Sequence, residues 1–272
     1  MSDRFRGVTA LVTGAGSGIG EATSRALVDR GAMVWLVDLH EDRIAALQKE
    51  LGEDKTRTAT VDVSDRQAMT ALAERVHAET GPLSILVNNA GYALVGSALD
   101  CTVDQWERQL GVNLMGVVYG VQLFGPSMAE AGGPASIVNI ASAAGFTGLP
   151  MMSAYSVSKC AVRAYSQSMA AEWDDQTLHV ACVCPGFLPT RIGEDGEYAG
   201  NLDEKHQRKR LNKLLDHQDR GPNDVAKAII RGIERRELMI HLYPESWQLD
   251  IARRILPERW LRAFKRRAVR SR

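Results

Sequence analysis

Tyr155 and Lys159 stand four residues apart in the segment YSVSK, which is otherwise built of small side chains. In a helix, residues at this spacing lie one turn apart on the same face. A phenol normally keeps its proton up to a pH of about 10, and a neighbouring ammonium group favours the phenolate. We therefore expect Tyr155 to exchange a proton nearer neutral pH. A chance pair on an exposed helix face would have the same spacing.

A glycine-rich turn is the second candidate site. The apolar run 8–12 leads into TGAGSGIG at 13–20, and a helical pattern follows. Such glycines permit a tight turn and the close approach of a pyrophosphate, which the N–H groups of the helix would bind. The spacing is G-x-x-x-G-x-G, and no Lys-Ser/Thr pair follows it, so the turn is not a Walker A loop. A turn that only connects two elements is the alternative.

Asp38 ends the second apolar run, eighteen residues after Gly20. A carboxylate at this position can accept hydrogen bonds from an adenosine ribose. The same charge would repel a 2′-phosphate, and the glycine turn carries no Arg or Lys to offset it. The sequence therefore favours NAD over NADP, unless Asp38 is a simple turn residue.

Short β-rich runs alternate with longer amphipathic stretches along most of the chain. Near-continuous apolar strands separated by helices indicate a parallel sheet covered on both faces. We predict an α/β, Rossmann-type doubly wound sheet of about seven strands in one domain, residues 1–245, followed by a helical tail, 246–272. The strands are expected at 8–12, 33–38, 58–63, 85–89, 136–142, 179–184 and 238–242, and the helices at 19–30, 41–51, 65–80, 103–130, 154–173 and 223–235.

The composition is that of an ordinary globular protein, with 272 residues, 45% hydrophobic and 24% charged. The four cysteines show neither a disulfide framework nor zinc-ligand spacing, so we expect no metal. No signal-peptide core and no run of 18 apolar residues is present, which favours a cytoplasmic location.

The last 27 residues are basic, with nine Arg/Lys against two acids in a chain of zero net charge. Trp247, Ile251 and Ile255 recur every four residues, and a second apolar group follows Pro257. The pattern predicts amphipathic helices that dock on the enzyme body or a neighbouring subunit, or lie peripherally on an anionic membrane surface. No nucleic acid partner is expected, because the basic charge is confined to the tail.

Several motifs in order resemble the short-chain dehydrogenase/reductase (SDR) family, in its compact single-domain form. The resemblance covers residues from about 6 to 243. It rests on TGxxxGxG at 13–20, NNAG at 88–91, Asn113, Ser142, YxxxK at 155–159, and PG at 185–186 with Thr190 after it.

The resemblance implies a catalytic set. Tyr155 matches the general acid/base, and Lys159 matches the residue that lowers the pKa of that tyrosine and binds the nicotinamide ribose. Ser142 matches the group that holds the substrate oxygen, although two further serines lie nearby. Asn113 matches the residue that kinks its helix and anchors a water linked to Lys159; a buried, satisfied helix asparagine is the alternative.

The resemblance also implies a set of cofactor contacts around the glycine turn and the later strand ends. Asn88 matches a position that steadies the central sheet. The implied cofactor-binding residues are Gly14, Ser17, Gly18, Ile19, Gly20, Asp38, Asp62, Val63, Asn89, Ala90, Gly91, Tyr155, Lys159, Pro185, Gly186 and Thr190.

The expected substrate loops, 92–99 and 143–153, are mainly apolar, whereas 191–220 is highly charged and could form a lid. Their apolar residues suit a hydrophobic alcohol or ketone, or they pack on the body or a partner subunit. These residues are Leu94, Val95, Phe146, Leu149, Met151 and Met152. The sequence thus predicts an NAD-dependent oxidoreductase that interconverts a secondary alcohol and a ketone of steroid, terpenoid or long-chain type, as a homodimer or homotetramer. The alternatives are a 3-oxoacyl-thioester reductase and a non-catalytic dinucleotide-binding regulator.

Overall fold

The computed structural model describes residues 3–173, 177–186, 188, 191–200, 205, 208–209, 211–212 and 221–255. Thr190, most of 201–220 and the tail after Ile255 lie outside the described residues. Within the described residues, no helix is both long and apolar enough to span a membrane.

Seven parallel strands form one sheet in the order β3-β2-β1-β4-β6-β7-β9. The central strands are buried along their whole length, as expected for a parallel sheet covered on both faces. The predicted fold class is therefore confirmed. The strands are β1 (Thr9–Thr13), β2 (Met33–Asp38), β3 (Thr56–Thr60), β4 (Ile85–Asn88), β6 (Ala135–Ile140), β7 (Leu178–Pro185) and β9 (Met239–Leu242).

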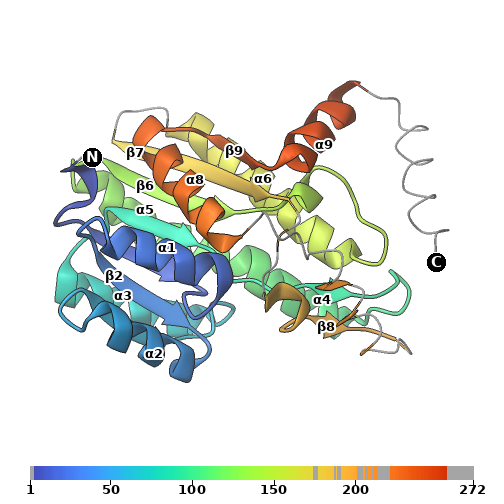
Figure 1. Cartoon of the computed structure of the whole chain (residues 1–272), viewed down its shortest axis with the longest axis horizontal. Coiled ribbons are helices and arrows are strands. Elements are labelled where there is room, and N and C mark those ends of the chain that lie inside the picture. The colour runs from blue at the N-terminus through green and yellow to red at the C-terminus, as the bar shows by residue number, and fades with distance from the viewer. Residues whose placement is uncertain are drawn as a thin grey trace.

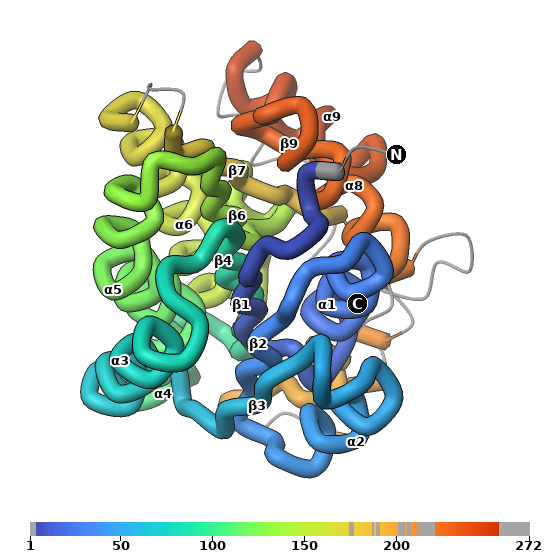
Figure 2. The backbone as a smooth tube through the Cα atoms, turned by 90° about the vertical axis from the view of Figure 1, so that its left-hand side faces the viewer, coloured from blue at the N-terminus to red at the C-terminus, as the bar shows by residue number. Residues whose placement is uncertain are grey.

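Helices cover both faces of this sheet. Helices α1, α2 and α8 lie on one face, and α3, α5 and α6 lie on the other (Figures 1 and 2). The chain order reverses between β1 and β4, the place where open α/β sheets bind ligands. The helices are α1 (Gly18–Val28), α2 (Glu41–Leu51), α3 (Arg66–Thr80), α4 (Val103–Leu110), α5 (Gly116–Glu130), α6 (Ser153–Glu172), α8 (Pro222–Arg235) and α9 (Pro244–Ile255).

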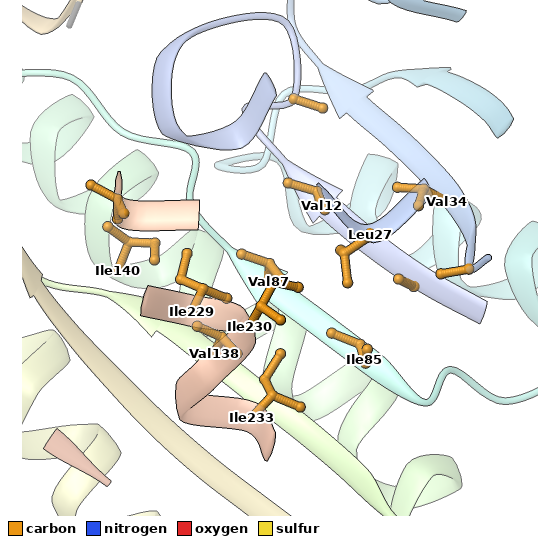
Figure 3. Close-up of a cluster of buried hydrophobic side chains, with 14 of the residues drawn as sticks. Val12, Leu27, Val34, Ile85, Val87, Val138, Ile140, Ile229, Ile230 and Ile233 are labelled. Atoms are coloured by element: carbon orange, nitrogen blue, oxygen red, sulfur yellow. The ribbon is translucent and has the colours of Figure 1, made fainter. Parts of the chain in front are cut away.

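One large apolar core lies between the sheet and helices α1 and α8. Ile229, Ile230 and Ile233 of α8 pack on the strands near Val87 and Val138 (Figure 3). All five side chains are almost fully buried. Burial of such side chains contributes about 1.5–3 kcal/mol each, and it fixes the strand ends that carry the site.

Residues 103–130 are helical, as predicted, with a π-helical interruption around Asn113, the residue matched to a helix kink. Helix α4 ends at Leu110, a π-helical turn spans Gly111–Met115, and α5 begins at Gly116. Asn113 lies in this turn and bonds to the backbone of Tyr92 instead of facing solvent. A side chain bonded outside its helix is a common cause of such a local bulge, which periodicity alone does not reveal.

A second, two-stranded sheet was not predicted. Strand β5 (Leu94–Val95) pairs in parallel with β8 (Glu197–Tyr198). An isolated bridge also joins Gly96 to Met152. Three chain segments that follow different strands are thereby held together beside the main sheet.

Helix α9 contains the described part of the basic tail, and it begins at Pro244, before the predicted boundary. Its polar side faces the body: the Ser246 hydroxyl donates to the Cys184 carbonyl over 2.7 Å, and Asp250 is 7% exposed. Trp247, Ile251 and Ile255 are 49%, 42% and 72% exposed. The expectation that this stripe docks on the body of the same chain is therefore wrong for these three residues.

Candidate active site

A cleft of about 1120 Å³ opens at the carboxyl ends of the central strands. Most of the predicted site residues line it, from the glycine turn, the end of β2 and the ends of β4, β6 and β7. Gly20 and Asn113 are not among its lining residues, and Thr190 lies outside the described residues.

The glycine turn brings its backbone to the floor of the cleft. Gly14 and Gly18 have φ angles of +64° and +53°, a region that glycine adopts without steric cost. A Cβ atom on Gly20 would lie 2.0 Å from the Gly14 carbonyl oxygen. Helix α1 can therefore start this close to β1 only with glycine at position 20. Ser17, Gly18 and Ile19 at the start of the helix line the cleft, and the free N–H groups of a helix start can bind an anion.

Asn89 braces this turn. Its side-chain amide donates to the carbonyl oxygens of Thr13 and Gly14 over 2.9 and 3.1 Å. The Thr13 hydroxyl in turn accepts the backbone N–H groups of Asn89 and Ala90. Asn89, predicted as a cofactor contact, thus lines the cleft and also fixes the loop after β4 against the turn after β1.

Asp38 lies at the end of β2 with its carboxylate fixed by backbone donors. Its oxygens accept the Gly16 N–H over 2.8 Å and the His40 N–H over 3.0 Å, and the residue is 8% exposed. Arg43 lies near Asp38: a Cβ on Gly16 would be 2.8 Å from the Arg43 Cβ and 3.0 Å from an Asp38 carboxylate oxygen, and the Asp38 charge contributes to the raised pKa of Arg43. Arg43 belongs to α2 and not to the glycine turn, so the absence of Arg and Lys from the turn did not indicate it.

The two residues predicted to contact adenine, Asp62 and Val63, differ in exposure, and Asn88 lies apart from both. Asp62 is exposed at the cleft, where its carboxylate accepts both the N–H and the hydroxyl of Ser64. Val63 is 6% exposed and packs near Gly116. Asn88 is buried on the far side of β4, where its amide donates to the Asn139 side chain over 2.9 Å, in keeping with a structural role.

Tyr155 and Lys159 lie in α6 on the face turned to the cleft. They are 7% and 5% exposed, and the Lys159 ammonium lies 5.9 Å from the centre of the Tyr155 ring. The ammonium donates to the Ile140 carbonyl at the end of β6 over 2.8 Å. The pair is therefore a buried arrangement at the sheet edge rather than an exposed helix face.

Burial acts on both groups of this pair. It lowers the pKa of Lys159 to about 8 and raises the pKa of Tyr155, on which the Ser142 hydroxyl acts in the opposite direction. The expectation of a lowered tyrosine pKa is thus not met in this structure. The physical reason is that desolvation of the buried phenolate outweighs the hydrogen bond with Ser142, while the Lys159 ammonium donates to the Ile140 carbonyl.

Asn113 bonds to the loop after β4 and to α6, next to the Tyr155–Lys159 pair. Its amide donates to the Tyr92 carbonyl and the Ser158 hydroxyl over 3.0 and 3.2 Å. A Cβ on Gly91 would lie 3.0 Å from its Oδ1 and 3.5 Å from the Lys159 ammonium nitrogen. The missing side chain at position 91 lets the loop after β4 approach both groups.

The remaining predicted residues close the reacting end of the cleft. Ser142 follows β6, and its hydroxyl oxygen accepts the Ala144 N–H over 3.1 Å. Pro185 ends β7, and the Gly186 N–H donates to the Leu242 carbonyl. These three residues line the cleft together with Tyr155.

The substrate side of the cleft is largely apolar, but not all predicted residues form it. Leu94 is 1% exposed in a separate cluster, and Phe146 packs beneath the loop, stacked on His241. For these two residues the alternative, packing on the body, holds, because both lie in buried clusters and neither lines the cleft. The apolar and aromatic lining consists of Tyr92, Val95, Leu149, Pro150, Met151, Met152, Leu188, Ile192, Leu211 and Leu249.

The residues present fit a dinucleotide. The turn offers an anion-binding helix start, Asp38 offers a fixed carboxylate for ribose hydroxyls, and Tyr155 with Ser142 stands at the opposite end. A parallel sheet with a cleft at its switch point is the arrangement typical of dinucleotide-binding α/β proteins.

Comparison with known proteins agrees with this class. The family model described as "short chain dehydrogenase" matches residues 8–197, and the chain belongs to this oxidoreductase family. The solved structure of a short-chain dehydrogenase/reductase from Burkholderia phymatum in complex with NAD superposes with a TM-score of 0.84 at 28% identity, covering 90% of this chain and 92% of that chain.

Two curated relatives are informative. The "Probable oxidoreductase EphD" of Mycobacterium tuberculosis (strain ATCC 25618 / H37Rv) is 36% identical over 253 residues, which covers 91% of this chain but 43% of that protein. The chain therefore spans less than half the length of this relative. The "NADP-dependent (R)-specific alcohol dehydrogenase" of Lentilactobacillus kefiri is 37% identical over 229 residues, covering 83% of this chain and 89% of that protein.

Proposed function

We propose that the chain interconverts a secondary alcohol and a ketone with NAD as the hydride carrier. The main observation that supports this proposal is the buried Tyr155–Lys159 pair beside Ser142 at the apolar end of the cleft. The cofactor, when bound, takes the hydride from the alcohol carbon or returns it to the ketone. Tyr155 takes or supplies the hydroxyl proton, Ser142 holds the substrate oxygen, and Lys159 keeps positive charge beside the phenol.

NAD is preferred over NADP in this proposal. The Asp38 carboxylate, fixed by two backbone N–H groups, suits ribose hydroxyls and repels a 2′-phosphate. Arg43 beside it and the NADP-dependent relative support the opposite preference, so NADP is kept as the second candidate.

The substrate is proposed to be a hydrophobic alcohol or ketone, on the basis of the apolar lining contributed by Val95, Leu149, Met151 and Met152.

The test is a panel of secondary alcohols of increasing apolar size, each assayed with NAD and with NADP through the absorbance of the reduced cofactor. We expect kcat/KM to rise with apolar size and to be higher with NAD. Activity confined to short polar alcohols would contradict the substrate class, and activity confined to acyl thioesters would favour the 3-oxoacyl-thioester reductase. Dinucleotide binding without turnover of any substrate would favour a non-catalytic regulator.

A homo-oligomer is also proposed, with α9 at one of its contacts. Trp247 and Ile255, more than two-fifths exposed on α9, would be covered by a second copy. Light scattering of the wild type and of the variant Trp247→Ser/Ile255→Ser checks this. A smaller mass in the variant is expected; an unchanged mass with lost binding to anionic vesicles would favour the membrane surface instead.

A further inference from the structure

An ion pair joins two walls of the cleft that are far apart in the sequence. The Arg43 guanidinium donates from Nη1 and Nη2 to the two carboxylate oxygens of Asp195, over 3.1 and 3.3 Å. Arg43 belongs to α2, and Asp195 follows the 3-10 turn Arg191–Gly193 beyond β7. We refer to this contact as the Arg43–Asp195 bridge.

Both residues of the bridge line the cleft that contains the glycine turn and Asp38. Arg43 stands directly against the turn, since a Cβ on Gly16 would be 2.8 Å from the Arg43 Cβ and 3.0 Å from an Asp38 carboxylate oxygen. The bridge therefore lies on the side of the cleft where the adenosine half of a dinucleotide would lie.

The segment that carries Asp195 is fixed at its other end. Glu197 pairs with Leu94 in the small sheet, and its carboxylate accepts hydrogen bonds from Gln105 and Arg108 of α4 over 2.9 and 2.7 Å. Segment 191–198 thus runs from an anchored end near α4 to a contact on α2. Among the described residues, Asp195 forms ion pairs with Arg43 and Arg191, and only the pair with Arg43 crosses to the other wall of the cleft.

We propose that the Arg43–Asp195 bridge closes the dinucleotide cleft and sets the rate at which the cofactor leaves. This inference rests on the proposed function only insofar as the cleft binds a nicotinamide dinucleotide. In this proposal, segment 191–198 moves away from α2 when a ligand on the glycine turn leaves, and that movement separates the bridge.

The electrostatics suit a contact that opens and closes. The Arg43 and Asp195 side chains are 21% and 32% exposed, so salt can screen their attraction. Partly exposed ion pairs of this kind shift an equilibrium constant by a few-fold. A guanidinium that donates from two of its nitrogens gives an effect at the upper end of that range. A contact of this strength can slow release without trapping the cofactor.

A different role for Arg43 makes the opposite prediction. If Arg43 were held in reserve as a ligand for a phosphate of the cofactor, removal of Asp195 would free it and tighten binding, most of all for NADP. If the bridge closes the cleft, removal of Asp195 speeds the release of both NADH and NADPH.

The test is stopped-flow release of NADH, followed by its fluorescence, from the full-length protein. We expect Asp195→Asn to raise the release rate constant about fivefold at low salt. Added NaCl should raise the rate constant of the wild type toward that of the variant and leave the variant almost unchanged. The reversed pair Arg43→Asp/Asp195→Arg should restore slow release.

Glu50→Gln is the matched control, because Glu50 forms an ion pair with Arg25 that also joins two elements but does not line the cleft. Its release rate constant should equal that of the wild type. Arg43→Gln provides a second variant should Asp195→Asn unfold, with the same acceleration expected. Unchanged or slower release in a folded variant, or acceleration that the reversed pair does not undo, would overturn the proposal.

The outcome is separable from that of the proposed function. If the wild type binds NADH with salt-sensitive release but oxidises no alcohol, the bridge stands and the catalytic proposal falls. If isothermal titration shows that the wild type binds no dinucleotide, both fall.

Discussion

Replacement of Lys159 by methionine tests how the buried ammonium affects stability. Methionine keeps the length of the side chain and removes its charge. Burial lowers the pKa of Lys159 from 10.5 to about 8, so between these values the unfolded chain holds a proton that the folded chain has lost. The contribution of Lys159 to the free energy of unfolding therefore rises with pH between about 8 and 10.5, and it does not change below pH ~8.

The size of the effect follows from the shift. Each pKa unit corresponds to about 1.4 kcal/mol, so the full shift is worth about 3 kcal/mol against the charged form. The lost hydrogen bond to the Ile140 carbonyl costs about 1 kcal/mol at every pH. Lys159→Met should therefore be about 2 kcal/mol more stable than the wild type at pH ~7, and this advantage should vanish by pH ~9.5.

Urea unfolding of both proteins at several pH values and constant ionic strength measures the difference in their free energies of unfolding. The other titratable groups are the same in both proteins, so their contributions cancel in this difference. Lys55→Met is the matched control for the change from lysine to methionine, because Lys55 is exposed. A difference between wild type and Lys159→Met that stays constant from neutral to alkaline pH would refute the burial of a charged lysine at this site.

Three further variants test other parts of the site. Asp38→Ala should reduce the preference for NAD over NADP by at least about tenfold in kcat/KM, because it removes the charge that opposes a 2′-phosphate; an unchanged ratio would place the ribose contact elsewhere. Gly20→Ala should lower the free energy of unfolding by about 1–3 kcal/mol, since the new Cβ meets a backbone oxygen at 2.0 Å, whereas Gly133→Ala, with nothing within 4 Å, should have no such effect in urea unfolding. Ser142→Ala should move the alkaline rise of alcohol oxidation to higher pH, because the Ser142 hydroxyl lowers the pKa of Tyr155; a pH profile that keeps its midpoint would contradict this.

The centre of the sheet could be predicted from the sequence because its strands are mainly apolar runs separated by helical stretches. Val12, Val87 and Val138 lie in such runs and are fully buried in neighbouring strands. The ends of these strands bring Asp38 and Ser142 to one cleft, as expected for parallel strands. The roles assigned to these two residues remain proposals.

Other features depend on contacts between distant segments, which periodicity does not encode. The π-helical turn depends on Asn113 bonding to Tyr92, and the small sheet depends on Leu94 meeting Glu197. The direction of the Tyr155 pKa shift depends on the balance between burial and charge, which the spacing of a motif cannot give.

The described part of the tail shows the same limit. The spacing of its apolar residues correctly predicted a stripe on a helix. It could not show which face of α9 meets the body, because that is set by the Ser246 bond to Cys184 and by Asp250, which lies 3.7 Å from His241. Helix α9 meets the body through these polar groups and through Leu249, and it leaves Trp247 exposed.

The most direct test of the account is the replacement Tyr155→Phe, which removes one oxygen atom and keeps the ring. We expect kcat for alcohol oxidation to fall by about a thousandfold or more, because the hydroxyl proton then has no acceptor, while the Kd for NADH changes by less than about twofold. Turnover by the Tyr155→Phe protein within about tenfold of the wild type would contradict the assignment of Tyr155 as the acid/base.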